Sequence, residues 1–139
     1  MAESRDDVRD LMASLLAPYV AAAQRVRSYL PGRLGGETPI VALASAGTRR
    51  DRMTAQGSRP VFRIDVHLFT LYASDADGWT EADAEDSLDA LEAGVGDFVD
   101  ENQRALRWRA VRYADMSRVD TIIEEGFTYR HEVIPLEVT

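Results

Sequence analysis

Two residues of this chain titrate near neutral pH, His67 and His131, and each lies in a stretch that alternates apolar and polar residues like a β-strand. A histidine of this kind can transfer a proton or ligate a metal ion. The alternative is an ordinary strand side chain, hydrogen-bonded or exposed. The sequence brings no partner to either histidine, and we therefore prefer the second interpretation.

Other combinations that could carry chemistry are weak. Glu124 and Glu125 could do acid–base work, but adjacent residues of a strand face opposite sides. No GxSxG, HExxH or phosphate-loop pattern occurs, and Gly35-Gly36 and Gly94-x-Gly96 are too short to form one. The absence of cysteine excludes thiolate nucleophiles, thiolate metal sites and disulfides. We expect no catalytic residue, no metal site and no cofactor, and hence no enzyme.

The length of 139 residues indicates one domain, because domains commonly run to about 100–150 residues. Aliphatic and aromatic residues make up 45% and charged residues 29%, which argues against disorder. No apolar run approaches the roughly 20 residues of a membrane helix, and the first residues lack the apolar core of a signal peptide. We therefore expect folding in a cytoplasm and no membrane partner.

Apolar residues recur every three or four positions in two segments, which predicts two main helices. The first helix runs from about 4 to 30, with Ser4 as its N-cap and a kink or break at Pro18. The second runs from about 81 to 103 and begins with a capping box of Thr80 and Asp83.

Five further segments have the patterns of strands. They are 39–45, 61–73, 108–116, 119–124 and a last piece from Phe127 to the end. Strands come in sequence-adjacent pairs, which favours antiparallel hairpins with helices packed on a face. The predicted fold is α+β: a single mixed, mostly antiparallel sheet flanked by two main helices, in one domain over residues 1–139.

Positive charge is concentrated in two segments of an acidic chain. The formal net charge is −8, yet residues 45–60 sum to plus three and residues 102–118 sum to plus four. We expect residues 46–60 to form a flexible basic arm between two strands. Its candidate contact residues are Thr48, Arg49, Arg50, Arg52 and Arg59.

Negative charge is concentrated in residues 75–101, which hold eleven acidic residues and no basic one. A charged helix face is usually only solvated. Together with a separate basic arm, however, it allows copies of the chain to meet head to tail, and such a contact closes into a ring when the rotation permits. Exposed ion pairs contribute about 0–1 kcal/mol each, so apolar contacts would carry the affinity. The candidate partner face is Glu85, Asp86, Asp89 and Glu92.

Dedicated DNA binding is not expected, because such proteins carry a net basic footprint and the pI of this sequence is about 4.7. Trp79 and Trp108 are expected to be core or interface anchors instead of stacking platforms for bases. Passing contact between the arm and a DNA that runs through a ring stays open.

Several segments, taken in order, resemble a known family. They are a strand ending in SAGTRR, a loop with Gly and Arg, a strand like FRIDVHLF, a turn with Trp79 before AEDSLDALEAGVGDFV, and the end EEGFTYRHEVIPLEV. Over most of the chain this arrangement is similar to the tail terminator, or tail completion, proteins of long-tailed bacteriophages. The motifs are patterns of residue type and spacing, without catalytic residues.

The resemblance implies a twisted sheet flanked by helices and assembly into a homohexameric ring. Such a ring sits on the last ring of tail tube protein, stops tube polymerisation and joins the tail to the head connector or head closure protein. The arm from Thr48 to Arg59 would contact neighbouring subunits and the tube. DNA would pass through the lumen without specific binding, since a lumen lined by carboxylates repels phosphate. The location would be the head-proximal end of the virion tail, after assembly in the host bacterial cytoplasm.

Two alternatives remain at this stage. A head closure, neck or other minor tail protein has the same small α+β character. A small α+β ligand-binding domain or enzyme is more remote. The sequence also leaves open whether the second predicted helix lines the lumen or contacts a neighbour.

Overall fold

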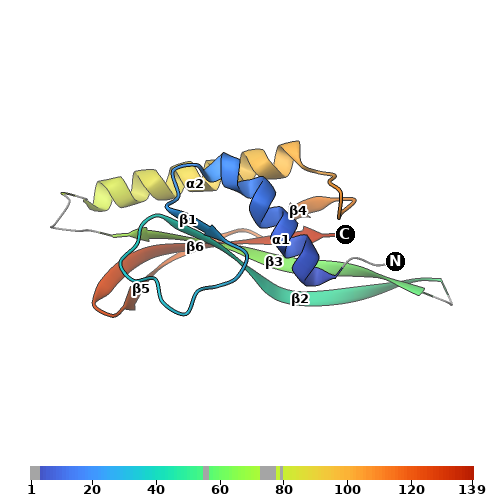
Figure 1. The fold of residues 1–139 in the computed structure, drawn as a ribbon. Helices are drawn as coiled ribbons and strands as arrows, with labels where there is room; N and C mark the ends of the chain where they lie inside the picture. The colour runs from blue at the N-terminus through green and yellow to red at the C-terminus, as the bar shows by residue number, and fades with distance from the viewer. Residues whose placement is uncertain (1–3, 55–56, 73–77, 79) are drawn as a thin grey trace.

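The computed structural model describes residues 4–54, 57–72, 78 and 80–139, in which two α-helices flank a six-stranded sheet (Figure 1). In chain order the elements are α1 (Arg5–Leu16), the 3-10 helix η1 (Ala17–Val20), β1 (Arg25–Arg27), β2 (Ile40–Thr54), β3 (Gly57–Leu71), α2 (Glu81–Glu101), β4 (Val111–Tyr113), β5 (Arg118–Glu124) and β6 (Phe127–Val138). The predicted α+β class, with a mixed sheet and two main helices, is confirmed.

The sheet is antiparallel except at one edge. Its strand order is β1-β2-β3-β6-β4, with β5 also paired to β6, and β1 runs parallel to β2. β4 and β5 pair with different parts of β6, so that together they form one interrupted outer strand. The centre of the sheet therefore joins β3 to β6, two strands that are far apart in the sequence.

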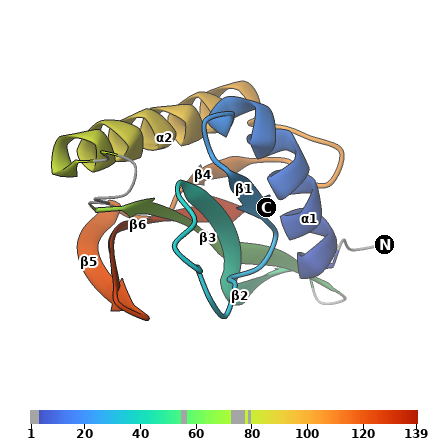
Figure 2. The same cartoon turned by 60° about the vertical axis from the view of Figure 1, so that its left-hand side comes forward.

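Both helices cover the same face of the sheet and enclose the main core there (Figure 2). The alternation predicted for the second strand segment is confirmed: Phe62, Ile64, Val66 and Leu68 are buried on this helix face. α2 presents its apolar stripe to them, and the buried residues of that stripe are Ala84, Leu88, Leu91, Val95, Phe98 and Val99. Burial of one large apolar side chain contributes about 1.5–3 kcal/mol, so this layer provides most of the hydrophobic stabilisation.

The opposite side of the sheet, called the open face below, carries the strand residues of the other parity. A smaller buried cluster lies on it, made of Leu34, Ile40, Ala42, Phe69, Leu71 and Tyr129. The connection between β1 and β2 supplies Leu34, whose backbone N–H donates to a carboxylate oxygen of Glu124 at 2.8 Å. This connection therefore covers part of the open face beside the β5–β6 hairpin.

Local signals at the helix starts are confirmed. Ser4 caps α1 by accepting a hydrogen bond from the Asp7 N–H, and Thr80 and Asp83 form the capping box of α2. The break at Pro18 is also confirmed, because α1 ends at Leu16 and η1 follows it. No helix among the described residues combines the length and apolar character needed to cross a membrane.

The first helix is shorter than predicted. Residues 25–27, predicted as helical, form β1 and pair with residues 40–42 of β2. Val26 keeps its inward position, half-buried against the main core. The open edge of β2 offers backbone hydrogen bonds, and this long-range partner cannot be seen in a local helical pattern.

The prediction of a flexible connection at 46–60 is also wrong, because residues 46–54 and 57–60 belong to strands. β2 and β3 are each 15 residues long, and their outer halves pair with each other in a hairpin that projects from the body of the molecule (Figure 1). We call this outer hairpin, residues 46–54 and 57–60, the arm. It lies beyond the core, so its sequence has no apolar alternation to reveal a strand, although its backbone groups still pair.

α2 packs closely against η1 at Gly94. A Cβ atom at this position would overlap the backbone carbonyl oxygen of Tyr19. The Tyr19 ring in turn packs edge-on against Phe98, with 5.9 Å between ring centroids. The close approach explains a glycine in the middle of α2, where glycine costs about 1 kcal/mol in helix propensity.

Candidate subunit interface

The arm presents different side chains on its two sides, because successive strand residues point in opposite directions. Thr48 lies on the side of α1, where the guanidinium group of Arg5 donates to its hydroxyl oxygen at 3.0 Å. Arg50, two residues later, shares this side. Arg49 lies on the open face, where it reaches Glu137 of β6. The predicted arm residues therefore belong to two separate surfaces.

On the open face, Arg49 is held within its own chain. Its Nε lies 2.8 Å from a carboxylate oxygen of Asp51, and its Nη1 lies 3.6 Å from one of Glu137. The hydrogen bond from Arg49 lowers the pKa of Asp51, and the same contact raises the pKa of Arg49. Arg59 lies opposite Asp51 in the strand register and lowers the pKa of Asp51 further. Most of this charge is therefore balanced before any partner arrives.

Arg50 differs from its neighbour. Its side chain is exposed and makes no ion pair with any residue that the structure describes. Arg52 pairs with Ser58 in the backbone register, and its side chain lies outside the described residues. Of the predicted arm residues whose side chains are described, Arg50 is thus the cation most available to a second molecule.

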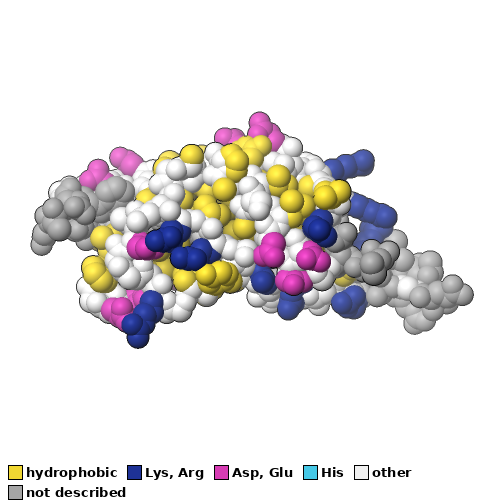
Figure 3. Space-filling view, viewed as in Figure 1, with side chains coloured by type: hydrophobic (Ala, Val, Ile, Leu, Met, Phe, Trp, Pro, Cys, Tyr) yellow, Lys and Arg dark blue, Asp and Glu magenta, His cyan; other side chains and the backbone are white. Residues whose placement is uncertain are grey.

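The predicted acidic face of α2 has one occupied and three available carboxylates. Glu85 is taken by Arg130 of β6, whose Nε lies 2.6 Å from its Oε1. Asp86, Asp89 and Glu92 are exposed, and within the described part of the chain they form no ion pair. Figure 3 shows acidic side chains at the top of the molecule, over α2; basic side chains lie at its right-hand end, and others lie at its left.

The negative field of α2 reaches a buried carboxyl group beneath it. Glu132 on β6 is only 5% exposed, and the Ser117 hydroxyl donates to it at 2.6 Å. Burial raises the pKa of Glu132, the Ser117 hydrogen bond opposes this shift, and the nearby Asp89 and Glu92 add to it. Like charges therefore accumulate here, and a basic partner bound over α2 would relieve their repulsion.

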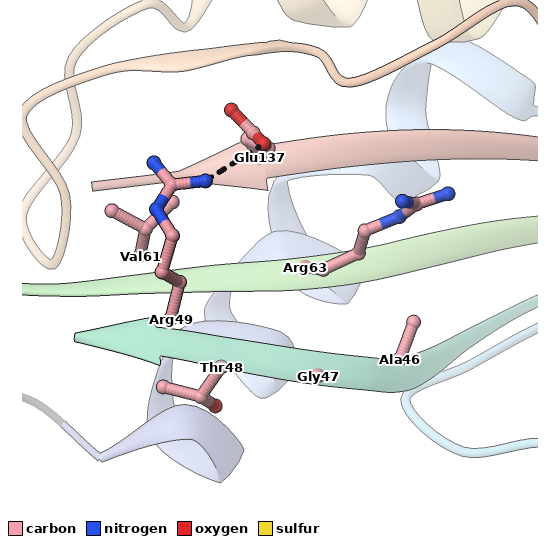
Figure 4. Close-up of a pocket in the computed structure, with 7 residues that line it drawn as sticks. All are labelled: Ala46, Gly47, Thr48, Arg49, Val61, Arg63 and Glu137. Carbon is pink, nitrogen blue, oxygen red and sulfur yellow. Dashed lines mark ion pairs between the residues drawn. The ribbon is translucent and has the colours of Figure 1, made fainter. Parts of the chain in front are cut away.

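A shallow pocket of about 270 Å³ lies at the base of the arm on the open face (Figure 4). Arg49, Arg63 and Glu137 line it together with smaller residues, which are Ala46, Gly47, Thr48 and Val61. The two guanidinium groups come from neighbouring strands and flank the pocket (Figure 4). Both guanidinium groups already have carboxylate partners within the chain, Arg49 with Asp51 and Glu137 and Arg63 with Asp65.

The two histidines, for which the sequence showed no partner, meet on the open face. Antiparallel pairing of β3 with β6 places His131 opposite Phe69, and Nδ1 of His67 then lies 2.9 Å from Nε2 of His131. Nδ1 of His131 lies 3.1 Å from a carboxylate oxygen of Asp120 on β5. No local sequence signal could have found this contact, because α2 and two strands separate β3 from β6 in the chain.

The hydrogen bonds of this histidine pair fit two neutral rings. Nδ1–H of His131 donates a hydrogen bond to Asp120, which leaves Nε2 of His131 to accept a hydrogen bond from Nδ1–H of His67. Burial lowers the pKa of both histidines, and His131 lowers the pKa of His67 further, whereas Asp120 acts on His131 in the opposite direction. Among the described residues, no group of three or more candidate ligands could hold a metal ion.

The remaining residues considered in the sequence analysis are the two tryptophans and the pair Glu124 and Glu125. Trp108 is a core anchor, 4% exposed, whose indole N–H donates to the carbonyl of Asn102 at 2.9 Å. Trp79 lies outside the described residues. Glu124 ends β5, whereas Glu125 lies in the following turn with a positive φ of 50°.

Models of known protein families give no match to this sequence, and a search of curated proteins gives none either.

Proposed function

We propose that this chain is a bacteriophage tail terminator, a structural virion protein that forms a homohexameric ring on the end of the tail tube. In this role it stops tube polymerisation and joins the tail to the head connector or head closure protein. The role requires binding surfaces and no catalysis. The chain would assemble in the host bacterial cytoplasm and act at the head-proximal end of the tail.

One observation carries the proposal: available charges of opposite sign lie on different parts of one molecule. Arg50 is on the arm, whereas Asp86, Asp89 and Glu92 are on α2, and none of the four forms an ion pair with a described residue. The arm projects from the sheet and α2 crosses its helix face, so one chain does not join the two (Figure 1). Copies that meet head to tail satisfy both surfaces, and this is the contact from which closed rings are built.

Charge alone would not hold such a ring together. Exposed ion pairs are worth about 0–1 kcal/mol each, so apolar contacts must add affinity. Leu106, which follows α2, is 87% exposed and is available for this purpose. In the proposal, charge sets the orientation of the subunits and apolar contact provides the free energy of association.

The net charge of −8 is consistent with a ring through which DNA slides. A lumen of negative potential repels phosphate, so DNA would pass without specific binding. A head closure or neck protein would place the same demands on the chain. Its distinguishing property is the partner, which would be the portal or connector and not the tube.

The decisive experiment measures ring formation by light scattering and electron microscopy, with and without tail tube protein. Arg50→Glu should leave the fold intact and weaken ring formation, because it places like charges together. Arg33→Glu is a control outside the arm: it makes the same charge change on a side chain that is 81% exposed, and it also removes an exposed ion pair with Glu125, whose contribution is about 0–1 kcal/mol. Combining Arg50→Glu with Asp86→Arg and Asp89→Arg should restore assembly.

Other results would count against the proposal. A strict monomer at high concentration in the presence of tube protein would refute it, as would rings of Arg50→Glu that match the wild type. Co-assembly with portal and not with tube would identify a head closure protein instead. Loss of function without loss of assembly on replacing His67 and His131 would favour the small binding domain or enzyme.

A further inference from the structure

β5 forms the exposed edge of the sheet at the end of the molecule away from the arm (Figure 2). It pairs with β6 along one side, and no described strand pairs with its other side. The backbone N–H and C=O groups on that outer side are ready to bond to another strand. Such an edge is a template for pairing with a second chain.

The side chains of β5 do not protect this edge. Val119, Thr121 and Ile123 point toward the helix face, where Val119 is 45% and Ile123 76% exposed. All three are β-branched residues, which pack well against each other across paired strands. The Thr121 hydroxyl accepts a hydrogen bond from Arg130 at 3.1 Å. Edge strands that avoid pairing usually carry lysine, proline or inward-pointing charges. The charged residues of β5 (Arg118, Asp120 and Glu124) all lie on the open-face side, whereas its helix-face side carries only β-branched residues.

The sequence of β5 is complementary to itself when two copies run antiparallel about Thr121. In this register Arg118 of each copy lies opposite Glu124 of the other, and Val119 lies opposite Ile123. Each dimer would thus contain two opposite-charge pairs, two apolar pairs, a central threonine pair and two pairs of Asp120 with Ile122, which add no attraction. Each of the other cross-strand pairs contributes about 0.2–1 kcal/mol.

Neighbouring registers lack this complementarity. In an antiparallel pair, residues whose backbone N–H and C=O groups point away from β6 must lie opposite residues of the same kind in the other copy. The register can therefore shift only by whole steps that preserve this match. Centring the pair on Asp120 sets two aspartates opposite each other, and centring it on Ile122 sets Asp120 opposite Glu124. Like charges directly opposite each other are destabilising, so charge selects the register about Thr121.

We propose that β5 is a binding site for β5 of a second copy of this chain, forming a two-fold dimer whose sheet continues across both molecules. Arg118 is exposed and has no ion pair with any described residue, and Glu124 uses Oε1 for Leu34, which leaves Oε2 for the partner. The inference goes beyond the proposed ring and does not rest on it. The arm and β5 lie at opposite ends of the molecule (Figure 1).

The test is a charge exchange followed by sedimentation across a concentration series. Arg118→Glu alone and Glu124→Arg alone each place like charges opposite each other, and each should weaken the dimer about tenfold or more. Because Glu124→Arg also removes the acceptor of the Leu34 N–H, the melting temperature of each variant is measured beside its association. An equimolar mixture of the two variants restores both opposite-charge pairs in a heterodimer. The mixture should therefore associate about as tightly as the wild type, a result that only a two-fold β5 contact in this register produces.

Two controls keep the test independent of folding and of the ring. Val119→Lys changes an exposed side chain and should abolish dimerisation while the melting temperature of the monomer stays the same. Arg50→Glu, the arm variant, should leave the β5 dimer intact. A wild-type monomer at every concentration, or single variants that associate like the wild type, would overturn the inference. So would a mixture that gains nothing over its components.

Discussion

The two faces of the sheet use their side chains differently. The helix face buries a continuous apolar layer against α1, η1 and α2. Two polar or charged side chains are buried among the described residues, Glu132 and Thr70, and both lie on this face. The open face has a smaller apolar cluster, and along the rest of its length it carries the histidine pair and the ion pairs of Glu137. The first face stabilises the chain, and the second leaves polar groups near solvent, where a partner can reach them.

This contrast indicates on which face substitutions can alter association while the fold is kept. Substitutions in the helix layer should act on the free energy of unfolding, whereas those on the open face and the arm should act mainly on association or on pH dependence. Four predictions examine this division, beginning with the largest expected effect.

Gly94→Ala should lower the free energy of unfolding by about 1–3 kcal/mol, because its methyl group would collide with the carbonyl of Tyr19 and push η1 from α2. Gly96→Ala is the matched control on the same helix. Its Cβ would have only an ordinary contact, 3.4 Å from the Tyr113 hydroxyl, and it should gain up to about 1 kcal/mol in helix propensity. Urea unfolding of both variants measures the difference, and equal losses would show that the α2–η1 contact is not tight.

The histidine pair should make stability fall as the pH drops below about 6.5. The pKa of each histidine is lowered in the fold, so below the ordinary value the unfolded chain binds protons that the folded chain does not. Where the unfolded state binds more protons than the folded state, the free energy of unfolding decreases as the pH decreases. Urea midpoints at a series of pH values should therefore decrease, and replacing both His67 and His131 by Gln should flatten the curve.

Glu132 provides an internal check of sign. Its pKa is raised, so the folded chain binds a proton above the ordinary value of 4.5, where the unfolded chain does not. This carboxyl therefore adds stability as the pH falls, opposite to the histidines. In Glu132→Gln the decrease at acidic pH should be steeper, and an unchanged slope would contradict the assignment.

The smallest effect is expected on the open face at Arg112. Its Nη2 lies 2.9 Å from Glu137, but the side chain is 68% exposed. Arg112→Ala should change the free energy of unfolding by less than about 1 kcal/mol, and the difference should shrink in high salt. A loss as large as that of Gly94→Ala would remove the distinction between the two faces.

Much of the fold could be predicted because its signals are local. Ser4 and the Thr80–Asp83 pair mark helix starts through hydrogen bonds that span three residues, and the alternation of residues 62–68 identifies the buried face of β3. The separation of positive from negative charge is also visible in the sequence, and it predicts the arm and α2 as the two candidate contact surfaces. The sequence does not show which of these charges can bind a second molecule, because Arg49 and Glu85 form ion pairs with residues of β6 in the same chain.

The sequence by itself determined the class of the fold, the helix starts, the inward side of β3 and the separation of positive from negative segments. Only the tertiary structure decided that residues 25–27 pair as β1, that the arm is a hairpin, that His67 meets His131, and that β5 has a free edge. The physical reason is range. Caps and periodicity depend on residues a few positions apart, whereas strand pairing depends on backbone groups brought together from distant parts of the chain.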